Sequence, residues 1–151
     1  MIRQATRSDI NAMLGLLHQL FTLEVDFRFS AERQKKGLEL LLASPSARIM
    51  VAEDQGEVVG MVTAQVVIST AEGEPSLLIE DLVVIPPRQH QGIAGTLLLA
   101  LDEWGAGMGA RRMQLLADCT NTPALDFYRH KGWHTTQLIC LRKYATKGIL
   151  T

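Results

Sequence analysis

The run Gln89-His90-Gln91-Gly92-Ile93-Ala94 has residue types and a position that suit anion binding, because it lies between a predicted strand and a predicted helix. The first backbone N–H groups of a helix have no partner within it, and the helix dipole favours an anion there. The small residues Gly92, Ala94 and Gly95 allow backbone amides to approach phosphate oxygens closely. The run therefore predicts a pyrophosphate-binding turn, although a purely structural strand-to-helix turn has a similar pattern.

This run departs from the common nucleotide-binding motifs. It lacks the terminal Gly-Lys-Ser/Thr of a P-loop, so a nucleoside triphosphate held with magnesium is disfavoured, and it lacks three glycines at dinucleotide-fold spacing. We also expect no metal site, because the histidines do not have metal-ligand spacing; they are His18, His90, His130 and His134.

Two adjacent carboxylates, Glu80 and Asp81, interrupt an apolar stretch over residues 77–85. Paired carboxylates raise the local concentration of a cationic amine and discriminate against anionic acceptors. Strand alternation points neighbouring side chains to opposite faces, so we expect only one of the two to reach a cleft. A solvated carboxylate at a strand edge is the alternative interpretation of Glu80.

A third group begins at Asn121, which opens a predicted helix, and Tyr128 follows seven residues later. A phenol has a pKa of about 10, so Tyr128 is mostly protonated at pH 7 and can donate a proton. For an isolated tyrosine, a half-buried helix position beside Phe127 is the alternative.

The composition favours one globular domain over residues 1–151. The chain is 47% hydrophobic and 21% charged, with a net charge of -1, so no basic excess favours nucleic acid or an anionic membrane as a partner. No apolar run approaches the roughly 18 residues of a membrane span, and the N-terminus lacks a signal-peptide pattern. We therefore expect a cytoplasmic protein.

Apolar periodicity and turn residues predict the elements that position these groups. The predicted helices cover about residues 8–22, the segment from Ser30 to Pro45, 93–104 (ended by Gly105, Gly107 and Gly109), and 122–130. One strand is predicted before the first helix, and the later strands cover residues 48–53, 58–69, 77–85, 112–117 and 133–144. The order β-α-α-β-β-β-α-β-α-β favours one mixed α/β sheet flanked by helices, with ligands bound at the carboxyl ends of strands.

Three segments in this order resemble the GNAT superfamily of acetyl-CoA-dependent N-acetyltransferases. They are the strand Glu80–Val84 ending in proline, the signature Q/R-x-x-G-x-G/A as Gln89, Gly92 and Ala94, and the block N-x-x-A-x-x-F-Y-x-x-x-G-W/F over 121–133. The pattern is closest to polyamine and aminoglycoside acetyltransferases. The resemblance implies a GNAT-like fold, acetyl-CoA as cofactor, and direct acetyl transfer to a primary amine of a small molecule in a ternary complex.

The resemblance also implies a role for each matched residue. Asn121 would hydrogen-bond the cofactor arm, and Tyr128 would return a proton to the leaving thiolate as general acid. The strand Leu82, Val83 and Val84 would flank the pantetheine arm and the acetyl carbonyl. The pyrophosphate would be held in the turn formed by Gln89, His90, Gln91, Gly92, Ile93, Ala94, Gly95 and Thr96.

Direct transfer needs a neutral amine, and alkylamines are mostly protonated near pH 7, so a base must accept a proton. Glu80 is the candidate, because its side chain faces the acceptor cleft if Leu82 and Val84 use backbone groups. Some family members carry an acid five positions before the asparagine; here Leu116 stands there, which removes one possible base.

We expect the acceptor wall within the segment Phe21–Arg33, which varies with substrate in the family. The expected substrate-binding residues are Asp81, Asp26, Phe27 and Arg28. Arg28 and Arg33 are equally consistent with binding an acceptor carboxylate or with a solvated charged face.

Two other functions stay open. An acceptor at a protein N-terminus or lysine side chain needs the same catalytic core, and a noncatalytic acyl-CoA-binding sensor would bind the cofactor without turnover. We also expect a homodimer, because sheet edges need cover and Leu138–Tyr144 is apolar.

Overall fold

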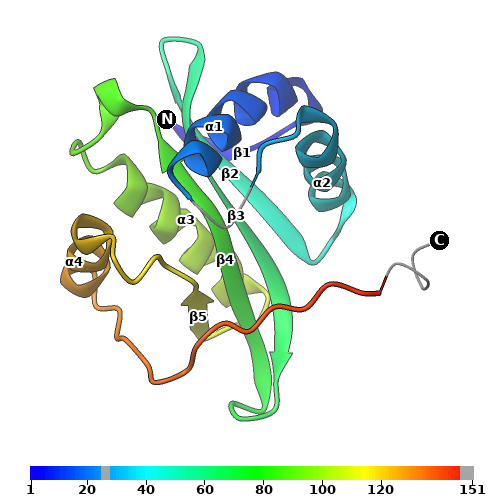
Figure 1. Cartoon of the computed structure of the whole chain (residues 1–151), viewed down its shortest axis with the longest axis vertical. Coiled ribbons are helices and arrows are strands. Elements are labelled where there is room, and N and C mark those ends of the chain that lie inside the picture. The colour runs from blue at the N-terminus through cyan, green and yellow to red at the C-terminus, as the bar shows by residue number, and fades with distance from the viewer. Residues whose placement is uncertain (25–27, 147–151) are drawn as a thin grey trace. The chain divides into compact units, whose positions relative to one another are not determined.

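A computed structural model describes residues 1–24 and 28–146 (Figure 1). The chain divides into two compact units, Met1–Leu115 and Leu116–Thr151. No helix in the described ranges has both the length and the apolar character that crossing a membrane requires.

The first unit is built on a mixed sheet, as the sequence predicts, and this sheet has five strands. Its strands lie side by side in chain order; they are β1 (Ile2–Gln4), β2 (Ala47–Asp54), β3 (Glu57–Ser69), β4 (Glu74–Val84) and β5 (Arg112–Leu115). Neighbours from β1 to β4 are antiparallel, whereas β5 runs parallel to β4. The long return from β4 to β5 is the crossover that a parallel pair needs.

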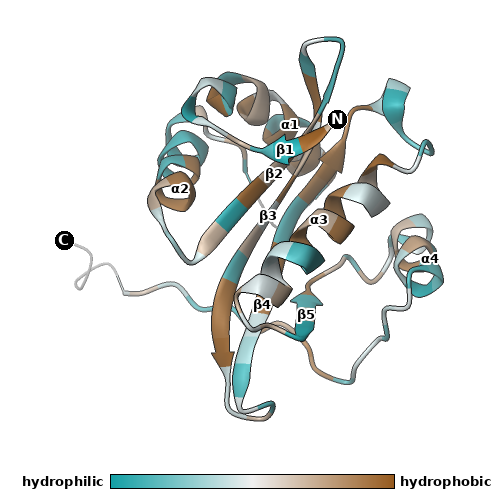
Figure 2. Ribbon diagram, turned by 180° about the vertical axis from the view of Figure 1, so that it is seen from behind, coloured by the Kyte–Doolittle hydropathy of each residue, from teal (hydrophilic) through white to brown (hydrophobic). Residues whose placement is uncertain are grey.

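Helices cover both faces of this sheet. The helices α1 (Ile10–Leu23) and α2 (Ala31–Ala43) pack on one face, and α3 (Ile93–Gly107) packs on the other (Figures 1 and 2). The hydrophobic core under α1 and α2 includes Met13, Leu38, Val51 and Met61, each at most 2% exposed. This burial explains the apolar periodicity of the two helices.

The helix α1 follows a short 3-10 turn at Arg7–Asp9, where Thr6 and Asp9 form a capping box. The backbone N–H of Thr6 donates to Asp9 Oδ2 at 2.7 Å. The same carboxylate accepts two hydrogen bonds from Arg3, at 2.8 and 2.9 Å, which join β1 to the start of the helix.

The prediction that Gly105 helps to end α3 is wrong. The helix continues to Gly107, and Gly105 is buried within it. A Cβ atom at Gly105 would lie 2.5 Å from Leu77 Cδ1. The glycine is therefore needed for the close approach of α3 to β4 rather than for a turn.

A β-bulge interrupts β4. Thr63 of β3 pairs with Glu80 and Met61 pairs with Val83, so the single residue between them on β3 faces two residues of β4. Before the bulge, Leu77 packs against α3; after it, Val83 joins the core under α1 and α2. Because of the extra residue, odd-numbered side chains point to α3 before the bulge and to α1 and α2 after it.

The described part of the second unit contains one helix, α4 (Thr122–His130), at the predicted position. The strand predicted over 133–144 is wrong: no strand forms in the described part of this unit. Four large apolar residues of this segment are instead 78–88% exposed; they are Leu138, Ile139, Leu141 and Tyr144. A strand requires a partner for its backbone groups, and apolar composition does not supply one.

Candidate functional site

The carboxyl-terminal half of β4 has an open edge within the first unit. The parallel strand β5 pairs with Ser76–Ile79, so among the described residues of this unit no strand lies beside residues 80–84 on that side. The backbone N–H of Ile85 donates to the Val59 oxygen at 2.9 Å. Because backbone groups alternate along a strand, those of Val84 and Leu82 point away from β3, toward the open edge. An extended ligand with amide groups can bind there as an added strand.

Two glutamines close the end of this edge. Gln19 Nε2 of α1 and Gln89 Nε2 of the following turn both donate to the Val84 carbonyl oxygen, at 3.0 and 2.9 Å. The predicted cofactor residue Gln89 thus fixes the end of the strand. By the same alternation, the backbone groups of Val83 point toward Met61 of β3, so Leu82 and Val84 form the edge.

The turn before α3 is open and left-handed at two residues. Gly92 caps the helix with a φ of +84°, and His90 has a φ of +63°. No side chain caps the first turn of α3, so its N–H groups remain available for an anion. A Cβ atom at Gly92 would meet no protein atom within 4 Å, which leaves room for a phosphate in front of the helix.

The bulge brings both carboxylates of β4 to one face. Glu80 pairs with Thr63 of β3, so the two side chains lie on one face of the sheet. Gln65, two residues along β3, lies on this face too, and it lines the same groove as Asp81. The expectation that alternation separates Glu80 from Asp81 is therefore wrong, because the bulge breaks the alternation. The Thr63 hydroxyl lies 3.1 Å from the Glu80 carbonyl oxygen and 3.3 Å from Asp81 Oδ2. Both oxygens are within reach of its single O–H donor.

Asp81 is the perturbed acid of this face. Burial and, to a smaller extent, the negative charges of Glu80 and Glu24 raise the pKa of its carboxyl to about 6, although the Thr63 hydrogen bond opposes this rise. Glu80 itself is exposed, whereas Asp81 is half-buried. A carboxyl of this kind is ionised at pH 7 and still accepts a proton more readily than an ordinary aspartate.

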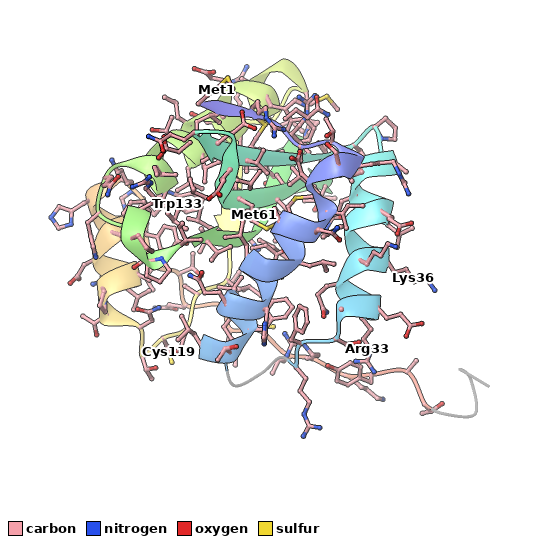
Figure 3. The ribbon with its side chains drawn as sticks, turned by 90° about the horizontal axis from the view of Figure 1, so that it is seen from above. Met1, Arg33, Lys36, Met61, Cys119 and Trp133 are labelled. Carbon is pink, nitrogen blue, oxygen red and sulfur yellow. The ribbon has the colours of Figure 1, made fainter. Side chains whose placement is uncertain are left out.

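A groove of about 380 Å³ lies in front of Asp81, against α1 and α2. Its apolar wall is formed by Leu17, Phe21, Leu38 and Leu41, and its polar atoms come from Arg33, Gln34, Ser44, Gln65 and Asp81. Figure 3 shows Arg33 near the N-terminal end of α2, which lies beside α1. The groove has the size and the mixture of apolar and charged groups that suit a small organic molecule.

The other predicted wall residues contribute less to this groove. Asp26 and Phe27 lie outside the described residues, and Arg28 is exposed. A second hollow, of about 550 Å³, lies along α1 and the turn that contains Gln89. It contains His18, whose ring stacks on Phe29 at a centroid distance of 4.5 Å.

In the second unit, Asn121 directly precedes α4 and Tyr128 lies within this helix. Asn121 caps the helix, with Oδ1 accepting from the Ala124 N–H at 3.2 Å, so its side-chain NH2 group is the part that can donate to a ligand. Tyr128 is half-buried, and its ring lies edge-on to Trp133 at 5.7 Å and to Phe127 at 5.4 Å. These contacts orient the phenol on its helix.

The sequence reasoning missed Gln19, Thr63 and Gln65. Gln19 is a polar residue on a helix with a strong apolar pattern, which was the available signal. Thr63 and Gln65 lie in a strand whose pattern gave no sign of the bulge opposite. Within residues 1–24 and 28–146, no group of three His, Cys, Asp or Glu residues could hold a metal ion.

Comparison with known proteins identifies relatives of both sequence and fold. Residues 17–133 match the sequence profile of the Acetyltransferase (GNAT) family. An aminoalkylphosphonate N-acetyltransferase of Salmonella typhimurium is 27% identical over 132 residues, covering 87% of this chain and 83% of that protein. An aminoglycoside N(6')-acetyltransferase type 1 of the same organism is 26% identical over 141 residues, covering 91% and 94%.

Solved structures show the same fold. The aminoglycoside acetyltransferase AAC(6')-Iy, in complex with the bisubstrate analog CoA-S-monomethyl-acetylneamine, gives a TM-score of 0.80 at 21% identity, covering 97% of this chain and 98% of that chain. An aminoglycoside 6'-N-acetyltransferase from Acinetobacter haemolyticus gives a TM-score of 0.82 at 18% identity, covering 97% and 99%.

Proposed function

The chain belongs to the acetyltransferase (GNAT) family, whose enzymes use acetyl-CoA, and from this premise we propose that it acetylates a primary amine of a small molecule by direct attack in a ternary complex. The observation that carries the proposal is the pair of carboxylates on one face of the β4 bulge, of which Asp81 lines a groove of about 380 Å³. Carboxylates attract an ammonium group and can accept its proton. Relatives named for aminoglycosides and aminoalkylphosphonates, both small amines, support this acceptor class.

The residues present fit acetyl-CoA. We propose that the open edge at Leu82 and Val84 holds the pantetheine arm, that the α3 turn from Gln89 to Thr96 holds the pyrophosphate, and that Asn121 donates to the arm. When bound, acetyl-CoA supplies a thioester, which is an acetyl group activated for attack by an amine. The orphan N–H groups and the dipole of α3 stabilise the phosphate charge without a side-chain cation.

We propose that Tyr128 is the proton donor for the leaving thiolate, as the family block implies. Its ring is oriented by Phe127 and Trp133. Removing a general acid lowers a rate by about 10²-fold or more. Tyr128→Phe keeps the ring and removes the hydroxyl, so we expect kcat to fall about 100-fold with unchanged acetyl-CoA affinity.

Two further parts of the proposal concern assembly. We propose that both units act as one acetyltransferase domain, which is supported by the family profile spanning their boundary. We also propose a homodimer in which the exposed apolar residues Leu138, Ile139, Leu141 and Tyr144 are covered by a second copy. Light scattering that gives about 16.7 kDa at working concentration would contradict the dimer. A cytoplasmic location stays a prediction.

The test of function is thiol release from acetyl-CoA with a panel of acceptors. The panel contains aminoglycosides, polyamines, aminoalkylphosphonates, amino acids and peptides with free N-termini. Turnover on small amines, reduced in Tyr128→Phe, supports the proposal. Turnover only on peptides would assign the chain to protein acetylation. Tight acetyl-CoA binding without release on any acceptor would indicate a sensor.

A further inference from the structure

Resting on the proposed function, we propose that Asp81, rather than Glu80, takes the proton from the acceptor ammonium. Asp81 is the extra residue of the β4 bulge, and it lines the groove between the sheet and the helices α1 and α2. Glu80 lies on the same face but is exposed. The Glu80 carboxylate is thus solvated, whereas the Asp81 carboxylate lies against the acceptor groove.

The backbone at Asp81 is a first sign of a functional position. Its φ is +57°, in the left-handed region that glycine adopts without strain and that side chains occupy at a cost. Residues held in such conformations concentrate at active sites. The chain keeps a carboxylate at a position where glycine would fold more easily.

The surroundings of Asp81 determine its proton affinity. The groups around it are Glu80 on β4, Glu24 after α1, Arg33 of α2 in the same groove, and the non-titrating Thr63 and Gln65 on β3. Burial and the two glutamates raise the pKa of Asp81 to about 6. This brings it closer to the pKa of about 10 of an alkylamine, while the carboxyl stays ionised at pH 7.

With Asp81 as the base, both protons that leave the acceptor ammonium are accounted for. The ammonium loses one proton to the Asp81 carboxylate, and the freed lone pair forms the N–C bond as the C–S bond breaks. A second proton leaves the nitrogen as the amide forms. One of the two protons ends on the CoA sulfur and the other passes to solvent when Asp81 is ionised again, so no other reactant is needed.

The experiment is the pH dependence of kcat/KM between about pH 5 and 8, which reports the pKa of the essential base in the free enzyme. We expect wild type to lose activity below about pH 6. Asp81→Gly is the informative variant, because glycine suits the φ of +57° and removes only the carboxylate. We expect kcat to fall at least 100-fold in this variant and in Asp81→Asn. We also expect both to lose the acidic limb of the pH profile, which is the fall in kcat/KM at low pH.

Two neighbouring variants separate a base from a merely structural residue. Glu80→Gln removes a negative charge that raises the Asp81 pKa, so the acidic limb moves to lower pH. Thr63→Val removes a hydrogen bond that lowers the same pKa, so the limb moves to higher pH, and Thr63→Ser restores it. Circular dichroism and acetyl-CoA affinity check that each variant is folded.

The outcomes distinguish this inference from the proposed function. An active enzyme whose acidic limb persists in Asp81→Gly and disappears in Glu80→Gln assigns the base to Glu80 and overturns the inference alone. A folded wild type that binds acetyl-CoA and releases no thiol with any amine overturns the proposed function, and the inference with it.

Discussion

Replacing Gly92 by alanine separates the role of this glycine in folding from its proposed role in cofactor binding. The φ of +84° at Gly92 is left-handed, and an alanine there costs about 1–2 kcal/mol of stability. A backbone N–H that binds a charged group contributes about 1.5–3 kcal/mol. Since about 1.4 kcal/mol corresponds to a factor of ten, displacing one such amide raises the KM for acetyl-CoA about 10- to 100-fold.

The chain contains a matched control in Gly56, in the turn between β2 and β3. Its φ is +82°, and an added Cβ would also meet nothing within 4 Å. We therefore expect Gly56→Ala and Gly92→Ala to lower the urea unfolding free energy by similar amounts, with only Gly92→Ala raising the KM in the thiol-release assay. Equal KM values in the two variants would refute the assignment of the pyrophosphate to this turn.

Three further predictions concern stability. Gly105→Ala places a methyl group 2.5 Å from Leu77 Cδ1, so we expect about 1–3 kcal/mol of destabilisation in urea, although alanine favours helix. The hydrogen bonds from Arg3 hold the pKa of Asp9 below its ordinary 3.8, so their contribution is present above about pH 4 and lost as pH falls through the folded-state pKa. Asp9→Asn should accordingly lower Tm at pH 7, and the difference from wild type should shrink as the pH falls below about 4. Burial raises the pKa of Asp81 to about 6, so wild type gains stability as pH falls from about 6 to 4, and Asp81→Asn should have a higher Tm than wild type at pH 7.

Sequence periodicity was sufficient for most elements of the fold. The apolar positions of α1 and α2 repeat at helical spacing because one face of each helix lies on the core. The capping pair Thr6 and Asp9 and the turn before α3 were also predictable, since they depend on local chemistry. The mixed sheet followed from the order of these elements.

Features that depend on tertiary contacts were not predictable. The approach of α3 to Leu77 makes Gly105 an interior helix residue, and nothing in its neighbours distinguishes it from a terminator. The terminal segment has strand-like composition, yet a strand also requires a partner. At the candidate site, the family motif indicated the cofactor turn, whereas the roles of Gln19 and Thr63 depend on residues distant in sequence.

The bulge in β4 has a consequence for how this strand tolerates genetic change. Leu77 packs in the layer under α3, and Val83 packs in the layer under α1 and α2. Which layer each side chain enters depends on the number of residues between them. Deleting one residue at position 81 would restore strict alternation and turn every later side chain of β4 to the wrong layer. Substitutions at this position should therefore be tolerated by the fold while a single-residue deletion is not, which makes the length of β4 a stronger constraint on folding than the identity of Asp81.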